Sequence, residues 1–439
     1  MTPYPEYIAT SLPWLPQIPA HWEISRAKNL YYKAARPVLD NAEVVTCFRD
    51  GQVTLRKNRR TSGFTESLKE IGYQGIAKGD LVIHVMDAFA GAVGVSDSDG
   101  KGTPVYSVCV AKDKRINNYY YAFIVREMAK RGFIQALYRG IRERSSDFRF
   151  EVFAAQSLPV PPAAEQEQIV LYLDSMTAKI NKLIRAKKKQ IALKIEMLNV
   201  YLFSENASCI SLGYWDNSFP NSWHKEKASK IFQERNSKGF VDKDLLAVTQ
   251  TRGVLFKKDC PQHFVQPSDF TKQKLVCPQD FIISLRSFQG GIETSFLEGL
   301  VSAAYSVFCL RTPSLLLTTY FQYLFKTPVF VAYLNTLVKD IRDGKKISFT
   351  DFRESLLPIP PQEHLEKIKS LSDEINILKK QLEKTTILLN EYKKSLIASV
   401  VTGQVDIRNI QVEDFDPADL ISETDDNPAE EESTEESEE

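Results

Sequence analysis

The stretch Leu158-Pro159-Val160-Pro161-Pro162 leads into a run with a helical apolar pattern, and it returns 199 residues later as Leu357-Pro358-Ile359-Pro360-Pro361. Proline fits the first turn of a helix, because its fixed φ is suitable there and its missing N–H is not needed. Each copy therefore predicts the start of a long helix after a globular segment. A repeat of this length is too long for a solenoid and indicates two related globular units, each followed by the same kind of helix.

Further matches at nearly the same spacing extend the repeat over most of the chain. They are Trp14, Pro19 and Trp22 with Trp215, Pro220 and Trp223; Asp80-Leu81-Val82-Ile83 with Asp280-Phe281-Ile282-Ile283; and Val105-Tyr106-Ser107-Val108 with Ala304-Tyr305-Ser306-Val307. A protein with two like units is suited to recognising two like ligands.

Each unit has the pattern of a mixed α/β domain. Strand-like runs bounded by Gly and Asp turns occur at 43–48, 80–85 and 105–110, and again at 245–249, 280–285 and 304–310. Segments 118–139 and 317–338 are predicted helices. The predicted organisation is a Pro-rich N-terminal segment with the first domain (1–156), a helical region (157–205), a second domain (206–354), a second helical region (355–407) and a tail (408–439).

The two long helices, the first predicted over about 163–203, carry apolar residues at steps of three and four, which is the heptad pattern of a coiled coil. The positions are Ile169, Leu173, Met176, Ile180, Leu183, Ile184, Ile191, Ile195, Leu198 and Leu202, then Ile368, Leu371, Ile375, Leu378, Leu382, Thr385, Leu389, Tyr392 and Leu396. Because the helices occupy equivalent places in the repeat, we expect them to pair antiparallel as an intramolecular coiled coil joining the two domains. The alternatives are packing of each helix on its own domain and pairing between two copies of the chain.

The net charge of zero hides an uneven distribution. Residues 413–439 hold 14 Asp and Glu and no Lys or Arg, so the rest of the chain holds 42 acidic against 56 basic residues. A basic body suits a polyanion, although an ordinary solvated surface also accounts for it. The tail is too polar to fold alone, so we expect a disordered, solubilising end. An alternative role for the tail is to mimic phosphate and weaken non-specific DNA binding.

The sequence argues against a membrane protein, a secreted protein and a zinc protein. No apolar run reaches the roughly 18 residues of a membrane span, and the N-terminus lacks a basic region followed by an apolar stretch. The six cysteines form no Cys-x-x-Cys pair, and the five histidines have no metal-binding spacing. We therefore expect a cytoplasmic protein that contacts no membrane and binds no metal.

Four features resemble the DNA specificity subunit of type I restriction–modification systems. They are Ser11–Trp22, the two Pro-x-Pro-Pro turns with the helices that follow them, Val401–Asp406 and Val248–Val254. The resemblance covers about residues 10–407. Glu165-Gln166 fits the family pattern after the first turn, whereas Gln362-Glu363-His364 departs from it after the second. The acidic extension beyond about 412 lies outside the pattern.

The resemblance implies a fold, a function and a set of partners. Two similar α/β target recognition domains would each read one half of a split site in double-stranded DNA. The paired helices would set the spacing of the half-sites and dock two modification subunits, which use S-adenosylmethionine to methylate adenine. Restriction subunits, which use ATP and Mg, would join the assembly. The chain itself is expected to hold no cofactor and to catalyse nothing.

The motifs present agree with a chain that has no chemistry of its own. The Pro-Pro pairs lack the Asn of the Asn-Pro-Pro-Tyr motif of similar adenine methyltransferases, and no Gly-x-x-x-x-Gly-Lys-Ser phosphate loop occurs. Asp80 and Asp280 stand at equivalent strand starts, where a turn before a core strand is the alternative to a catalytic carboxylate. A stand-alone nuclease with duplicated domains and a coiled-coil interaction protein without a DNA role are the competing hypotheses.

Candidate DNA-contacting residues are those that donate to phosphate or to base edges. In the first unit they are Arg49, Arg56, Lys57, Asn58, Arg59, Arg60, Arg142 and Arg144. In the second unit they are Arg252, Lys257, Lys258, Lys272, Lys274, Arg286, Arg342, Lys345 and Lys346. The densest group, residues 56–60, forms a polar loop after a predicted strand. For each residue alone, the alternative is a solvated surface charge.

Overall fold

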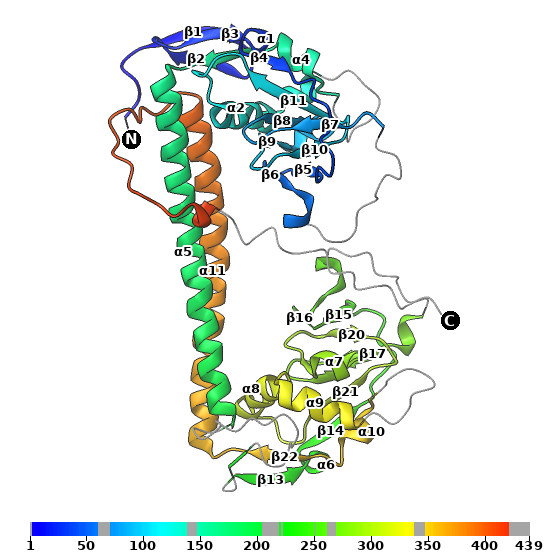
Figure 1. The fold of residues 1–439 in the computed structure, drawn as a ribbon. Helices are drawn as coiled ribbons and strands as arrows, with labels where there is room; N and C mark the ends of the chain where they lie inside the picture. Colours follow the sequence, from blue (N-terminus) through cyan, green and yellow to red (C-terminus); the bar gives the residue numbers. More distant parts are fainter. Residues whose placement is uncertain are drawn as a thin grey trace. The chain divides into compact units, whose positions relative to one another are not determined.

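The computed structural model describes residues 2–59, 71–137, 147–203, 219–220, 223–250, 252–260, 269–337 and 347–420 (Figure 1). The described residues divide into two compact units, one within residues 1–185 and 385–420 and one within residues 186–384. Each unit therefore holds one α/β domain and one part of each long helix.

The first unit is built around an antiparallel sheet of strand order β4-β11-β8-β9. These strands are β4 (Tyr31–Lys33), β11 (Tyr106–Ala111), β8 (Leu81–His84) and β9 (Val93–Val95). Successive side chains of a strand point to opposite faces of the sheet. Leu81 and Ile83 therefore join a core with helix α2 (Asn118–Lys130), while Val82 joins a second core with the hairpin β5–β6 (Val45–Cys47 and Val53–Leu55).

Shorter elements complete the first unit. They are β1 (Tyr7–Leu12), β2 (Leu15–Pro19), β3 (Glu23–Arg26), α1 (Ala27–Leu30), η1 (Arg56–Asn58), β7 (Gln74–Ile76), η2 (Ala88–Ala90), β10 (Gly100–Gly102), α3 (Phe133–Ala136), α4 (Phe150–Ala155) and β12 (Ser157–Val160). Strands β1 and β2 pair as a hairpin in the segment that the sequence marks only as Pro-rich. The predicted helix 118–139 ends early, because Gly132 takes a positive φ of 72° between α2 and α3.

The second unit repeats this topology. Its main sheet has the order β14-β21-β18-β19, and its two-stranded sheets β15-β16, β17-β20 and β13-β22 match β5-β6, β7-β10 and β3-β12. Its elements are β13 (His224–Lys227), α6 (Ala228–Ile231), β14 (Phe232–Arg235), β15 (Leu246–Thr249), β16 (Gly253–Phe256), η5 (Lys257–Asp259), η6 (Phe270–Lys272), β17 (Lys274–Val276), β18 (Phe281–Ile283), α7 (Ser287–Gly290), β19 (Glu293–Thr294), β20 (Gly299–Val301), β21 (Ser306–Leu310), α8 (Leu315–Leu324), α9 (Pro328–Thr336), α10 (Phe349–Phe352) and β22 (Leu356–Ile359). The predicted helix 317–338 is two helices, because the Thr327 side chain caps a new helix that begins at Pro328.

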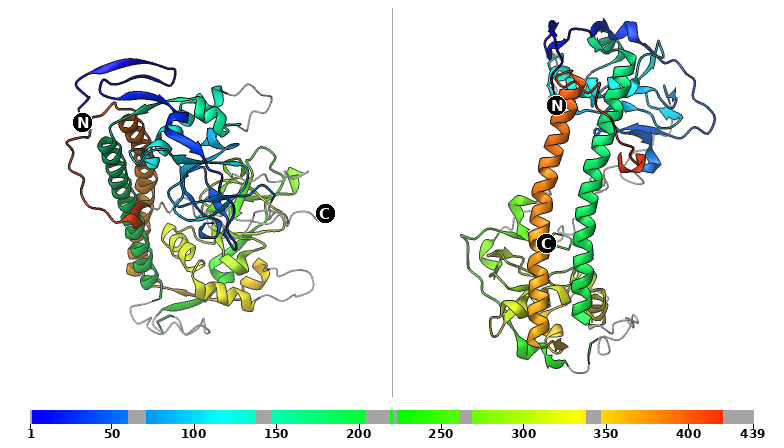
Figure 2. Two further views of the ribbon diagram at one scale, coloured as in Figure 1. Left: turned by 45° about the horizontal axis from the view of Figure 1, so that its top comes forward. Right: turned by 90° about the vertical axis from the view of Figure 1, so that its left-hand side faces the viewer.

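The predicted intramolecular pairing of the two long helices is confirmed. Helix α5 spans Ala163–Phe203 and α11 spans Gln362–Val401, and they lie side by side in two further views (Figure 2). In the first unit Ile169 of α5 shares a core with Leu396 of α11. In the second unit Leu198 shares a core with Ile375, and Lys194 Nζ lies 2.8 Å from Glu374 Oε2. The N-terminal part of α5 therefore contacts the C-terminal part of α11, and the C-terminal part of α5 contacts the N-terminal part of α11. The two helices are antiparallel.

Two predicted positions of the heptad pattern are wrong. The side chains of Leu183 and Tyr392 are each 44% exposed. At the first of them Ile184 is buried instead, which is where the apolar pattern of α5 slips by one residue. The helix pair therefore keeps its contact through the slip by changing which residue faces inward.

A C-terminal strap, residues 407–420, lies along α5, so the prediction of disorder from residue 408 is wrong for this part. Side chains of α5 hold its backbone carbonyls: Gln168 Nε2 donates to Ile410 O (2.7 Å), Ser175 Oγ to Glu413 O (3.3 Å) and Asn181 Nδ2 to Asp419 O (2.9 Å). Arg185 pairs with the Asp419 carboxylate, and the strap ends in η7 (Pro417–Leu420) (Figure 1). The rest of the predicted tail, 421–439, lies outside the described residues.

The repeated tryptophans anchor each domain to the start of a long helix. Trp22 Nε1 donates to Glu165 Oε1 at 3.0 Å on α5. In the second unit Trp223 packs edge-on against the ring of His364 on α11, with centroids 5.8 Å apart. His364 thus stands where Glu165 stands in the first copy. The departure of Gln362-Glu363-His364 from the family pattern replaces a hydrogen bond with a ring contact at the same place.

Candidate nucleic-acid interface

The hairpins β5–β6 and β15–β16 carry most of the described candidate residues. In the first unit the turn at residues 48–52 is closed by a hydrogen bond from Phe48 N to Gln52 O at 2.9 Å, and Gly51 takes a φ of 92° that suits glycine. The 3-10 helix η1 follows β6 directly, and η5 follows β16. Each hairpin therefore presents basic residues from its turn and from the short helix after it.

The candidate residues of the first hairpin are bonded within the unit. The pairs are Arg49 Nη2 to Asp87 Oδ1 (2.9 Å), Arg59 Nη1 to Asp50 Oδ2 (2.7 Å), Lys57 Nζ to Glu43 Oε2 (2.6 Å), Arg56 Nε to Thr46 Oγ1 (3.4 Å) and Asn58 Nδ2 to Thr54 Oγ1 (2.9 Å). Arg59 also stacks 4.3 Å from the centroid of the Phe48 ring. Exposed ion pairs contribute only about 0.2–1 kcal/mol. DNA phosphates can therefore replace the carboxylates as partners of Arg49 and Lys57 at small cost.

The second hairpin presents a similar set. Lys258 Nζ lies 2.9 Å from Asp244 Oδ2 and 4.9 Å from the centroid of the Phe256 ring. Arg252 is exposed in the turn, where its backbone N–H donates to Thr249 Oγ1 at 3.1 Å. Arg286 precedes α7, and its carbonyl accepts from Gln250 Nε2 at 3.1 Å. The structure therefore brings the loop before α7 to the turn of this hairpin. Lys257 lies beside Lys258 in η5.

One ion pair of the hairpins is duplicated. Lys57 pairs with Glu43 and Lys258 pairs with Asp244, and both members are shifted by 201 residues. This is the shift of the repeated tryptophans, so the acidic partners were detectable in the sequence, but only as part of the repeat. The duplicated pair joins the short helix after each hairpin to the segment that leads into the hairpin.

The remaining candidates do not join the hairpin groups or cannot be placed. Lys272 and Lys274 belong to η6 and β17, where Lys272 Nζ lies 3.7 Å from Asp269 Oδ2 and Lys274 Nζ donates to Tyr305 O at 2.6 Å. Six predicted residues lie outside the described residues: Arg60, Arg142, Arg144, Arg342, Lys345 and Lys346.

Comparison with known proteins finds similarity in structure alone. No family model and no curated protein matches the chain. A chain of the structure described as "Structural basis underlying complex assembly and conformational transition of the type I R-M system" matches with a TM-score of 0.53 and 12% identity, over 88% of this chain and 99% of that one. The HsdS subunit from Thermoanaerobacter tengcongensis matches with a TM-score of 0.44 and 13% identity over 88% of this chain and 98% of that one. The type I restriction–modification S subunit from M. genitalium matches with a TM-score of 0.41 and 13% identity, over 91% of this chain and 99% of that one.

This chain has the fold of a type I restriction–modification specificity subunit. The match that carries this conclusion spans nearly all of both chains. It agrees with the duplicated domain topology and with the paired helices.

In this specificity-subunit fold, Asp80 and Asp280 have structural partners. Asp280 Oδ2 lies 2.7 Å from Arg235 Nε and accepts from Cys277 N at 2.8 Å. Asp80 pairs in the same way with Arg36 and accepts from Ala77 N at 2.8 Å. Burial raises the pKa of the Asp280 carboxyl, while Cys277 N–H and Arg235 act against it. Both carboxylates therefore close the turn before a core strand and have no exposed edge for chemistry.

The described part of the specificity-subunit fold offers no metal cluster and no membrane helix. No group of three or more His, Cys, Asp or Glu side chains there could hold an ion. No helix in the described ranges combines the length and the apolar character needed to cross a bilayer.

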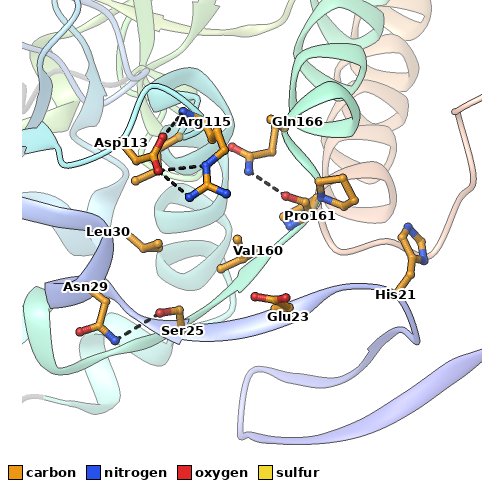
Figure 3. A pocket seen from close by; sticks show the side chains of 13 residues that line it. His21, Glu23, Ser25, Asn29, Leu30, Asp113, Arg115, Val160, Pro161 and Gln166 are labelled. Carbon is orange, nitrogen blue, oxygen red and sulfur yellow. Dashed lines mark hydrogen bonds and ion pairs between the residues drawn. The ribbon is translucent and has the colours of Figure 1, made fainter.

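A pocket of ≈ 350 Å³ lies at the start of α5 in the first unit (Figure 3). Several polar groups that line the pocket bond to one another: Gln166 Nε2 donates to Pro161 O at 2.8 Å, Arg115 Nη2 lies 2.6 Å from Asp113 Oδ2, and Asn29 Nδ2 donates to Ser25 Oγ at 3.4 Å. Each of these bonds is local, and Asn117 N, which donates to Gln166 Oε1 at 2.9 Å, ties the loop before α2 to the helix start. The pocket therefore adds nothing to the interface on the hairpins.

Proposed function

We propose that this chain is the DNA specificity subunit of a type I restriction–modification complex. Each recognition domain reads one half of a bipartite site in double-stranded DNA, and the paired helices set the spacing of the halves. Two modification subunits with S-adenosylmethionine methylate adenine in the site. Restriction subunits with ATP and Mg join the same assembly, and the chain itself catalyses nothing.

One observation carries the proposal: the same domain occurs twice, with the same strand order and with basic residues on the same hairpin. The sheets β4-β11-β8-β9 and β14-β21-β18-β19 agree strand by strand. The short helices η1 and η5, which follow the hairpins, then carry cations at matching positions, including Lys57 and Lys258. Two copies of one recognition domain with different loop side chains suit a DNA target made of two different halves.

The outer faces of the long helices supply a docking surface for the modification subunits. On α11 the side chains of Ile377, Ile387 and Leu388 are 55%, 60% and 64% exposed. On α5 the exposed side chains include Leu193, at 51%. Apolar side chains left open along a helix favour a protein partner. Ile377 belongs to the second unit and Ile387 to the first, so each unit offers its own contact, as two modification subunits require.

Reconstitution tests the proposal. The chain is co-expressed with a type I adenine methyltransferase subunit from the same genome, where one is encoded, and complex formation, DNA binding and adenine methylation are measured with each component left out. We expect a complex that methylates a split site only when this chain is present. Metal-dependent DNA cleavage by the purified chain alone would favour a nuclease, and a complex with no DNA preference would favour an interaction protein.

A further inference from the structure

A lysine ties two loops together beneath the second hairpin. Lys326, just after α8, donates from Nζ to Gly290 O at 2.9 Å and to Gln250 O at 3.4 Å, and it pairs with the Glu293 carboxylate. Gln250 lies in the hairpin turn and Gly290 ends α7. The Glu293 carboxylate is buried, and this burial raises its pKa while Lys326 lowers it. The lysine therefore links the hairpin turn to the loop that carries Arg286.

An arginine occupies the same place in the first unit, 200 residues earlier. Arg126 extends from α2 toward the turn at 48–52: a Cβ added to Gly51 would lie 2.4 Å from Arg126 Nη1, and one added to Gly91 would lie 4.0 Å from its Nε. Gly51 and Gly91 are 200 residues before Thr251 and Gly291. The guanidinium thus lies between the hairpin turn and the turn that ends η2, and both turns leave room for it by lacking a side chain.

The two cations differ in how they are satisfied. Among the described residues Arg126 Nε is buried without a hydrogen-bond partner, whereas Lys326 has two carbonyls and a carboxylate. Burial lowers the pKa of Arg126, and the Asp50 carboxylate acts against this. A buried cationic nitrogen without a partner is unfavourable. Because a cation stands at this position in both units, we infer a role beyond the stability of the domain.

We propose that Arg126 and Lys326 are positioning residues for DNA recognition, one in each half. Each holds the hairpin turn against the loop from the central strand, so that Arg49 and Arg59, or Arg252 and Arg286, meet DNA in one arrangement. This inference rests on the proposed function and adds to it the residues that fix the reading loops. Loss of either cation loosens one pair of loops and leaves the other pair intact.

Arg126→Met and Lys326→Met test the inference in the assembled methyltransferase complex. The readout is the rate of methylation of the wild-type site against sites with one changed base in the first or the second half. We expect each variant to lose about tenfold in discrimination in one half only, the scale of one good base contact, and to keep discrimination in the other. Arg126→Lys and Lys326→Arg should restore most of it.

Two controls separate positioning from damage to the fold. Lys130→Met removes an exposed cation one turn further along α2 and should leave discrimination unchanged. Glu293→Gln keeps the shape of the partner of Lys326 and should relax only the half affected by Lys326→Met. Unchanged discrimination in folded Arg126→Met and Lys326→Met complexes, or equal loss in both halves, would overturn the inference. Failure of the wild-type complex to prefer a two-part site would instead overturn the proposed function.

Discussion

Substitution of two isoleucines on α11, two residues apart, distinguishes the pairing of the helices from the docking of a partner. Ile375 is fully buried in the core that also holds Leu198, while Ile377 is 55% exposed. Replacing Ile375 with Ala removes about three buried carbons, at about 0.8 kcal/mol each, and leaves a cavity. We expect the free energy of unfolding of the second unit to fall by about 3 kcal/mol. Ile377→Ala, with the same change in chemistry, should lower it by about 0.5 kcal/mol or less.

For partner binding we expect the opposite order: Ile377→Ala should lower the affinity for the modification subunit more than Ile375→Ala does. Urea unfolding followed by far-ultraviolet circular dichroism measures stability, and co-purification at increasing salt measures the affinity for the modification subunit. Ile377→Ala should weaken the complex several-fold while the subunit stays folded, because it removes an exposed apolar contact. Equal and small losses of stability for both variants would refute the buried helix pair, and full affinity in Ile377→Ala would refute this docking surface.

Three further variants test separate contacts. Burial raises the pKa of Asp174 on α5 to about 6, and Lys393 on α11 acts against this. Because the folded pKa lies above the unfolded one, the ionised carboxylate costs stability at neutral pH. Asp174→Asn should therefore stabilise the fold by about 1–2 kcal/mol at pH 7. In thermal melts this gain should become smaller as the pH falls toward about 4. Arg235→Met leaves the buried Asp280 carboxylate unpaired and should cost the second unit about 1–3 kcal/mol in urea, with no loss if that turn does not depend on the pair. Asn181→Ala frees the strap carbonyls of Asp419 and Leu420, so limited proteolysis should cut the strap sooner; unchanged cleavage would mean that this amide does not hold it.

The long helices and the duplicated domains could be predicted from the sequence because local patterns specify them. The heptad spacing and the prolines before residue 163 gave the bounds of α5 as the structure has them, Ala163–Phe203. Some sheet strands also lay within predicted apolar runs, such as 80–85 for β8 (Leu81–His84) and 280–285 for β18 (Phe281–Ile283), whereas the sheet strands β4, β9, β14 and β19 lay outside all of them. The break at Thr327-Pro328 had a local signal as well, since Thr before Pro is a common start of a helix.

Other features depend on contacts between distant segments. The strap at 407–420 leads into the acidic tail, and its place depends on distant partners: Ile407 joins the first core, and Gln168, Ser175, Asn181 and Arg185 on α5 donate to its carbonyls. The pairing of Lys57 with Glu43 needs the hairpin register, and the place of Arg126 needs the packing of α2. The basic residues chosen from the sequence therefore pointed to the hairpins, but the sequence did not reveal Glu43 and Arg126, which contact these hairpins.

Exchange of one recognition domain tests the central claim most directly. Residues 21–156 are replaced by the matching segment of a relative, and the methylated adenine motif is mapped in cells that supply the modification subunit. Our account predicts that one half of the motif changes, while the other half and the spacing between them persist. A change in both halves, or in neither, would contradict two independent readers on one chain.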